Sequence, residues 1–247
     1  MTQNRRTVVD PRQAERRRSL MFKIGAAVVL VAIAAGVAIW AVMSNKEDSS
    51  TGGSDVPTVA QPDGSIRVTG AAAGTEPKVV VSVVEDFQCP ACGMFESTKG
   101  QTLAELAKRP DVAVDYKPII FLDRFGHDYS ANTANASMCV AEASGKDGDM
   151  SKWLKFHNLL FANQMSEGTA GPSTDDMRKW AEEAGVTGVA DCMANNQFGQ
   201  WITEQTKTIL DDPAFQGTPW VRINGETVDG MGMTPEQLTA AVDAAAK

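Results

Sequence analysis

The stretch VVVSVVEDFQCPAC, residues 79–92, decides how this chain folds. Its first six residues are apolar except for Ser82, a pattern that predicts a buried β-strand. Two acids and an aromatic residue follow, and then the Cys-x-x-Cys pair Cys89 and Cys92. Residues 94–108 have the pattern of a helix. A dithiol therefore lies where a strand passes into the start of a helix.

The position of the two cysteines at the helix start favours thiol–disulfide exchange. Cys89 falls at the N-cap, Pro90 at the first helical position and Cys92 at the third. Proline suits the first position because its missing N–H would have no helical partner there. Unpaired N–H groups and the positive end of the helix dipole stabilise a thiolate at the N-cap. We therefore expect Cys89 to be the acidic, exposed nucleophile and Cys92 the resolving thiol behind it.

A Cys-x-x-Cys pair can also be half of a zinc site or an inert structural disulfide. A zinc site of cysteines and histidines needs a second close pair of ligands. The other candidate ligands do not form such a pair in the sequence; they are Cys139, Cys192, His127 and His157. The pattern favours redox chemistry and predicts no metal site.

Composition and charge limit the size of the folded domain and the classes of function open to it. The chain has 247 residues and 43% hydrophobic content, enough for one domain of about 180 residues with appendages. The formal net charge is -8, but the first 43 residues carry seven basic and two acidic side chains. The rest of the chain, with 16 basic and 29 acidic residues, has a net charge of -13. Such an acidic part is a poor candidate for nucleic-acid binding, which depends on neutralising phosphates.

An uncharged segment near the N-terminus predicts a membrane anchor. Residues 24–43 carry no charge, and as a helix they would span about 30 Å, the thickness of a bilayer's hydrocarbon core. The basic residues lie before it, so 1–23 should be a cytoplasmic segment and the rest of the chain extracytoplasmic. A cleaved signal peptide is the alternative, although its apolar region is usually shorter and 41–44 offers no clean cleavage site. Residues 17–21 also faintly resemble a twin-arginine export signal.

Ser, Thr, Gly, Asp and Pro dominate residues 44–64, which predicts a flexible linker before a folded domain at 65–247. Apolar patterns within the domain predict strands at 65–69, 78–87 and 111–122, and helices at 130–144, 151–164, 174–184 and 189–210, the last with breaks near Asn195 and Gly199.

The end of the chain carries two local signals. Residues 216–225 predict a tight turn into a short strand, and Asn224-Gly225 predicts a hairpin to a partner strand at 226–228. Thr234-Pro235-Glu236-Gln237 is a capping box, which opens a terminal helix.

These pieces together resemble the thioredoxin fold: a strand, a Cys-x-x-Cys at a helix start, a β-hairpin entered through Gly217-Thr218-Pro219, and a closing helix. The helical stretch at about 123–212 is similar to the helical insertion of the DsbA-like disulfide oxidoreductases. The resemblance covers 65–247, and the anchor, acidic ectodomain and second cysteine pair are most similar to extracytoplasmic DsbA-like proteins of actinobacteria. It implies an α/β thioredoxin fold with an inserted helical subdomain, preceded by one transmembrane helix.

The resemblance also implies roles for single residues. Cys89 would be the attacking thiol and Cys92 the buried resolving thiol, with Pro90 and Ala91 completing the active-site motif. Pro219 would be the family's cis-proline, against the dithiol, and the backbone of Thr218 would bind an extended substrate peptide by β-augmentation. A trans Pro219 at a strand start is the alternative. Trp220 is expected either in the substrate groove or in the core.

Two departures from the family pattern concern the thiolate and its proton. DsbA-type sites often place a histidine between the cysteines, where this chain has Ala91. Many thioredoxin-like proteins bury an acid six residues before the first cysteine, where this chain has Val83. Other acids, Glu85, Asp86 and Glu96, would be near enough to assist proton transfer from Cys92. The simpler interpretation, which we favour from the sequence, makes them solvated residues at a strand end and on a helix.

The remaining cysteines and histidines receive structural interpretations. Cys139 and Cys192 fall on two helices of the insertion, and outside the cytoplasm we expect them to form a disulfide rather than two free core thiols. His127 and His157 are expected in a surface loop and on a partly buried helix face, respectively.

Together these observations predict a membrane-tethered, extracytoplasmic thiol–disulfide oxidoreductase that introduces disulfides into secreted proteins through Cys89 and Cys92, without a cofactor. The resemblance implies secreted or cell-envelope protein thiols as substrates and a membrane redox partner of the DsbB or vitamin K epoxide reductase type. A reductase or isomerase with the same dithiol, a peptide-binding chaperone-like domain with a non-catalytic dithiol, and a structural metal module are the alternatives.

Overall fold

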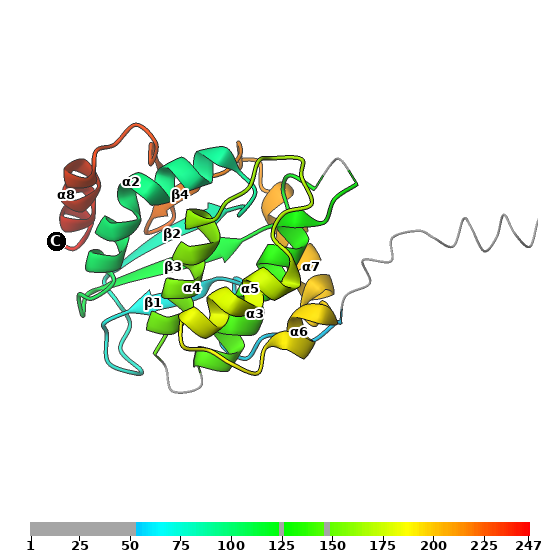
Figure 1. Ribbon diagram of the computed structural model, residues 1–247. Coiled ribbons are helices and arrows are strands. Elements are labelled where there is room, and N and C mark those ends of the chain that lie inside the picture. Colours follow the sequence, from blue (N-terminus) through cyan, green and yellow to red (C-terminus); the bar gives the residue numbers. More distant parts are fainter. Residues whose placement is uncertain (1–52, 124–125, 146–148) are drawn as a thin grey trace, which may run out of the picture. The chain divides into compact units, whose positions relative to one another are not determined.

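A five-stranded sheet forms the centre of the protein in its computed structural model, which describes residues 53–123, 126–145 and 149–247 (Figure 1). The order across the sheet is β1-β3-β2-β4-β5, with β2 and β3 parallel and the other neighbouring pairs antiparallel. The strands are β1 (Ile66–Thr69), β2 (Val79–Glu85), β3 (Val112–Pro118), β4 (Trp220–Ile223) and β5 (Glu226–Val228).

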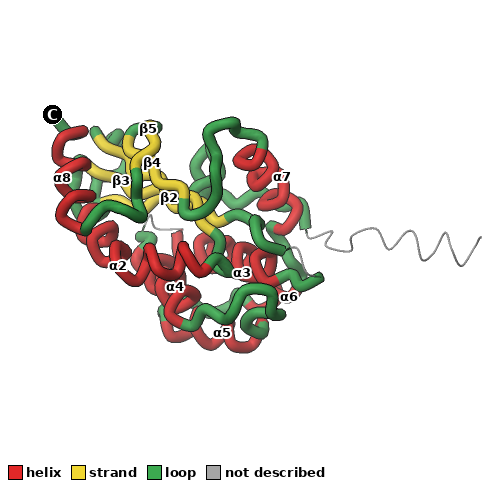
Figure 2. Tube along the Cα trace, turned by 90° about the horizontal axis from the view of Figure 1, so that it is seen from above, coloured by secondary structure: helices red, strands yellow, loops and turns green. Residues whose placement is uncertain are grey.

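Helices cover the sheet and form a separate group beside it (Figures 1 and 2). Helix α2 packs against β3, and α8 packs against β2 and β4. The insertion between β3 and β4 supplies five helices, of which α3 contacts the other four and α4 contacts α2. The helices are α2 (Pro90–Leu106), α3 (Tyr129–Ser144), α4 (Ser151–Ala162), α5 (Thr174–Glu183), α6 (Ala190–Ala194), α7 (Gly199–Leu210) and α8 (Pro235–Ala245).

The central strand β2 packs against the core on both of its faces, because it is apolar on both. Val81 and Val83 pack with residues of α2 and α8 in the main core, whereas Val84 packs with Ile209 of α7 on the opposite face. Every residue of β3 is buried. This burial places the end of β2, and the dithiol after it, on a rigid support.

The hairpin and the terminal helix form as the sequence predicts. Asn224 and Gly225 both have positive φ angles, 48° and 86°, as a tight hairpin turn requires. The side chain of Thr234 accepts a hydrogen bond from the N–H of Gln237, and the side chain of Gln237 accepts one from the N–H of Thr234. This reciprocal capping box starts α8.

The strand predicted at 111–122 is shorter in the structure. β3 ends at Pro118. Beyond it the N–H groups of Phe121 and Leu122 donate to the carboxylate of Asp86 instead of extending the sheet. The carboxylate of Asp86, in the loop after β2, thus binds the N–H groups that a longer strand would have paired within the sheet.

The segment before β1 corrects the predicted linker. Residues 53–64 belong to the predicted flexible linker 44–64, but the hydroxyl of Thr58 donates to Glu142 of α3 at 2.6 Å and the N–H of Gly53 donates to the carbonyl of Asn196 at 2.8 Å. The sequence missed these contacts because their partners come from the distant insertion. Segments 1–23, 24–43 and 44–52, including the predicted anchor, lie outside the described residues. Among the residues that the structure does describe, no helix has the length and apolar character needed to cross a bilayer.

A disulfide joins Cys139 of α3 to Cys192 of α6. Replacing both cysteines by alanine should lower the free energy of unfolding by about 4 kcal/mol, because the bond closes a loop of some 53 residues in the unfolded chain. Urea denaturation of the oxidised protein and of the double variant measures the difference. Equal stability of the two proteins would mean that the bond does not constrain the unfolded chain.

Candidate active site

The dithiol occupies the N-terminus of α2. Cys89 is the N-cap, with φ -72° and ψ 119°, and Pro90 takes the first helical position. The carbonyl of Cys89 accepts the helical hydrogen bond of Gly93 at 3.1 Å, and its N–H donates to the carbonyl of Asp86 at 2.9 Å. The local geometry is the one that the spacing of cysteines and proline predicts.

Both cysteines are free thiols, and their burial differs from the prediction for Cys89. Cys92 is fully buried, as expected of a resolving thiol, but only 7% of the surface of Cys89 is exposed. The expectation of a well-exposed nucleophile is therefore wrong. The reason is the loop before β4: the sulfur of Cys89 lies 3.6 Å from the carbonyl of Thr218, which covers it. A substrate would approach Cys89 along the edge of this loop.

The environments of the two thiols move their pKa values in opposite directions. A hydrogen bond from the Cys92 thiol, with those from the N–H groups of Cys92 and Ala91, lowers the pKa of Cys89 to about 5, against the opposing effect of burial. Burial, together with the adjacent Cys89, raises the pKa of Cys92 far above its usual value. Cys89 is therefore a stable thiolate at neutral pH, while Cys92 keeps its proton.

A groove runs beside the dithiol, and the bond between Thr218 and Pro219 at its wall is cis. Trp220 is both a core and a groove residue: its ring packs with Val84, and its Nε1 donates to Thr227 at 2.9 Å. The groove has a volume of about 530 Å³ and is lined by Ala91, Ala214, Gln216–Val221 and Thr227–Met231.

Asp86 is buried, which corrects the prediction that it is solvated. Its carboxylate accepts hydrogen bonds from the N–H groups of Gln88, Phe121 and Leu122 and from the hydroxyl of Ser130. Burial raises the pKa of Asp86 to about 6 despite these donors. The side chain thus connects the loop before Cys89 to the end of β3 and the start of α3.

Glu85, Glu96 and His157 form a buried cluster, which also corrects the sequence interpretation. Nε2 of His157 lies 2.7 Å from Oε1 of Glu85, and both side chains are fully buried. Burial opposes a charge on His157, but the ion pair with Glu85 prevails and raises its pKa to about 9. Burial raises the pKa of Glu96 to about 7. This arrangement could not be predicted from local sequence patterns, because Glu85 and His157 are 72 residues apart.

Aromatic rings enclose the imidazole of His157. Four of them lie with their centroids 4.8 to 5.6 Å from that of His157, and they belong to Phe87, Tyr116, Trp153 and Phe161. This low-dielectric surrounding strengthens the ion pair to Glu85. The predicted partly buried helix face is therefore a fully buried, charged site. His127, in contrast, is exposed as expected.

The same three side chains are a group that could hold a metal ion, since their ligand atoms lie within 4.8 Å of one another. Metal binding requires a neutral imidazole. With a pKa of about 9, His157 is protonated at neutral pH and paired with Glu85. The cluster is better suited to exchanging protons, because burial raises the pKa of Glu96 to about 7 beside the ion pair of Glu85 and His157.

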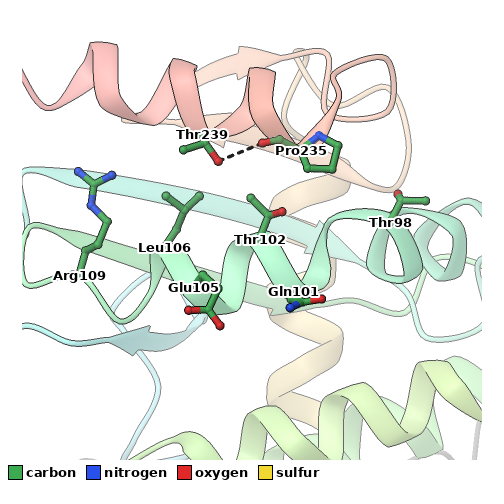
Figure 3. A pocket seen from close by; sticks show the side chains of 8 residues that line it. All are labelled: Thr98, Gln101, Thr102, Glu105, Leu106, Arg109, Pro235 and Thr239. Atoms are coloured by element: carbon green, nitrogen blue, oxygen red, sulfur yellow. Dashed lines mark hydrogen bonds between the residues drawn. The ribbon is translucent and has the colours of Figure 1, made fainter.

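A second hollow lies between α2 and α8, away from the dithiol (Figure 3). It has a volume of about 560 Å³. Its charged groups already have partners: Arg109 pairs with Asp111 and Asp243, and Glu105 pairs with Lys108. No unpaired charge points to a ligand there, so the groove beside Cys89 is the candidate site.

The contacts of two glutamines around the active-site loop had no sequence prediction. Gln88 donates to Asp123 and Ser130, and Gln164 donates to the carbonyls of Phe87 and Cys89. The position of Gln88 directly before Cys89 could have indicated a role in the active-site loop. Gln164 carries no local signal, because it follows α4 at a distance of 75 residues from Cys89.

Comparison with known proteins gives a consistent assignment. Residues 68–244 match the family model described as Thioredoxin. The chain is 33% identical to DsbA of Mycobacterium tuberculosis, over 74% of this chain and 92% of that one, with a TM-score of 0.63. It is also 33% identical to the disulfide oxidoreductase DsbG of that organism, over 76% and 95% of the two chains, with a TM-score of 0.63.

A more distant structure shares the fold: MdbA of Corynebacterium diphtheriae, a thiol–disulfide oxidoreductase, is 20% identical over 81% of this chain and 99% of its own, with a TM-score of 0.60. No curated protein sequence matches the chain significantly. The family match over most of the domain and the dithiol at the start of α2 agree. The chain belongs to the thioredoxin family and is a DsbA-like thiol–disulfide oxidoreductase.

Proposed function

We propose that this protein is a membrane-tethered, extracytoplasmic dithiol oxidase that introduces disulfides into secreted or cell-envelope proteins. The observation that carries the proposal is the place of Cys89 at the start of α2 beside an open groove, where its surroundings lower its pKa to about 5. A thiolate this stable favours the reduced enzyme, and so makes its Cys89–Cys92 disulfide a strong oxidant.

The reaction transfers two electrons from substrate to enzyme. A substrate thiolate attacks the sulfur of Cys89, the Cys89–Cys92 bond breaks, and Cys92 leaves and takes up a proton. A second substrate thiolate then attacks the substrate sulfur of the mixed disulfide. The Cys89 thiolate leaves, so that the substrate is oxidised and the enzyme holds a dithiol. Its low pKa makes Cys89 a good leaving group in the second step.

Cys92 needs a proton source, because burial makes its thiolate unstable. Glu85 interacts electrostatically with Cys92, and Glu96 belongs to the same cluster with a pKa of about 7. The cavity between α2 and α4, of about 210 Å³, is lined in part by Glu96. Glu96 would supply the proton to Cys92 and recover it from solvent through this cavity.

The groove suits an extended polypeptide. Its wall carries the cis bond at Pro219 and the carbonyl of Thr218 beside Cys89, and Met231 gives it an exposed apolar side chain. Backbone groups at such a wall bind peptides without regard to sequence, and methionine adapts to varied apolar partners. The substrates in this proposal are therefore unfolded chains with pairs of thiols.

The proposal also includes a location for the protein and a partner that reoxidises it. The uncharged residues 24–43 would anchor the protein with its domain outside the cytoplasm. The Cys139–Cys192 disulfide supports an oxidising compartment, where such bonds persist. The reduced dithiol must pass its two electrons on, and a membrane redox partner of the DsbB or vitamin K epoxide reductase type would accept them.

The reduction potential of the Cys89–Cys92 couple tests the direction of the reaction. Equilibration of the purified domain with glutathione buffers should give a value nearer about -120 mV than about -270 mV. The oxidised domain should also restore disulfides to a reduced, unfolded substrate protein in stoichiometric amounts. A potential near about -270 mV would instead assign the dithiol to a reductase.

A further inference from the structure

The loop that follows α4 contacts three consecutive residues of the active-site loop, Phe87, Gln88 and Cys89. Nε2 of Gln164 donates to the carbonyls of Phe87 and Cys89, each at 2.9 Å. The N–H of Gly168 donates to the side-chain carbonyl of Gln88 at 2.7 Å. Both amide hydrogens of Gln164 are therefore used on the backbone of the active-site loop.

A missing side chain in α2 makes room for Gln164. A Cβ at position 93 would lie 2.3 Å from Oε1 of Gln164 and 3.0 Å from its Cδ. Gly93 does not have a positive φ, so its backbone does not require glycine. Glycine inside a helix costs about 1 kcal/mol relative to alanine. The close approach of Gln164 is the feature of the structure that explains this glycine.

From these contacts we propose that Gln164 is a positioning residue that holds Cys89 in the N-cap geometry on which its reactivity depends. The backbone of Cys89 has the N-cap conformation, and this places its sulfur where the N–H groups of Ala91 and Cys92 help to lower its pKa. Gln164 fixes that backbone on both sides of Gln88, without touching the sulfur. The helical insertion thereby controls the acidity of the nucleophile in the thioredoxin part.

This inference rests on thiol exchange at Cys89, but not on the direction of the reaction. The test is the pKa of Cys89 in the reduced protein, followed by thiolate absorbance, and the equilibrium constant with glutathione. Gln164→Met keeps the side-chain length but loses both donors. It should raise the pKa of Cys89 by about half to one unit and shift the glutathione equilibrium about 3- to 10-fold towards the enzyme disulfide.

A second variant approaches the same contact from the other side. Gly93→Ala keeps the glutamine at position 164, but the added methyl group pushes its side chain aside. This variant should therefore also raise the pKa of Cys89. In the double variant Gly93→Ala, Gln164→Met the two effects should not add, because the contact is already lost. Asn163→Ala is the matched control: Asn163 is exposed, donates only within α4, and should leave the pKa unchanged.

The outcomes separate this inference from the proposed function. An acidic Cys89 in the wild type whose pKa does not move in Gln164→Met or Gly93→Ala leaves the oxidoreductase intact and overturns the role of Gln164. Equal shifts in Asn163→Ala would overturn it too, since the effect would not be specific. A wild-type Cys89 that titrates like a free cysteine would contradict the proposed function instead.

Discussion

The variant Cys89→Ser is expected to oxidise substrate thiols no faster than the uncatalysed background. Serine cannot form the enzyme disulfide or the mixed disulfide, so both steps of exchange are lost. Cys89 is also the more acidic of the two thiols and the one beside the groove. The measurement is the recovery of activity of a reduced, disulfide-containing substrate protein incubated with the oxidised enzyme.

The companion variant Cys92→Ala should accumulate mixed disulfides. Its Cys89 thiolate attacks a substrate disulfide, releases one substrate thiol and stays bonded, because no resolving thiol remains to break the bond. Non-reducing electrophoresis of cell extracts then shows adducts that disappear on reduction. Thr208→Ala, at an exposed position on α7, is the control that should oxidise substrate normally. Full activity of Cys89→Ser would contradict the assignment of the nucleophile.

The second large effect concerns the buried ion pair. Changing His157 to leucine should lower the free energy of unfolding by about 3 to 5 kcal/mol, because it leaves the fully buried Glu85 without its partner. Glu85→Leu should lower the free energy of unfolding by a comparable amount, because it leaves the buried His157 without its partner. The double variant should be less destabilised than the sum of the two, since no uncompensated charge remains. Urea denaturation of the reduced proteins near pH 7 measures all three values.

The pH dependence provides a further check on His157. Its pKa is about 9 in the folded protein and about 6.5 in the unfolded chain, so the folded state holds the proton more tightly. The stability that the charged imidazole contributes is complete below about pH 6.5 and is lost as the pH rises through about 9. His127→Leu, at an exposed histidine, should change neither the stability nor its pH dependence. A loss of less than about 1 kcal/mol in His157→Leu would contradict the ion pair.

Local patterns in the sequence were sufficient for the secondary structure and the dithiol. The strand before Cys89, the proline after it and the hairpin at Asn224 each depend on neighbouring residues, so their signals lie within a short window. The same holds for the capping box at Thr234. The pairing of Cys139 with Cys192 was expected because cysteine pairs outside the cytoplasm form disulfides.

The surroundings of the dithiol could not be predicted in the same way. Glu85 ends a strand and would be solvated there, but helix α4 brings His157 over it. Cys89 would be well exposed on an isolated helix, but the carbonyl of Thr218 covers it from 129 residues away. Gln164 reaches the loop from the end of α4. Each of these features depends on tertiary contacts between the insertion, or the hairpin loop, and the start of α2.

The most direct test of the account is the titration of Cys89 in the reduced wild-type protein, followed by thiolate absorbance. We expect half-ionisation near pH 5, with Cys92 remaining a thiol throughout the neutral range. Half-ionisation near about pH 8.5, as in an unperturbed cysteine, would contradict the claim that the structure stabilises a thiolate at the start of α2.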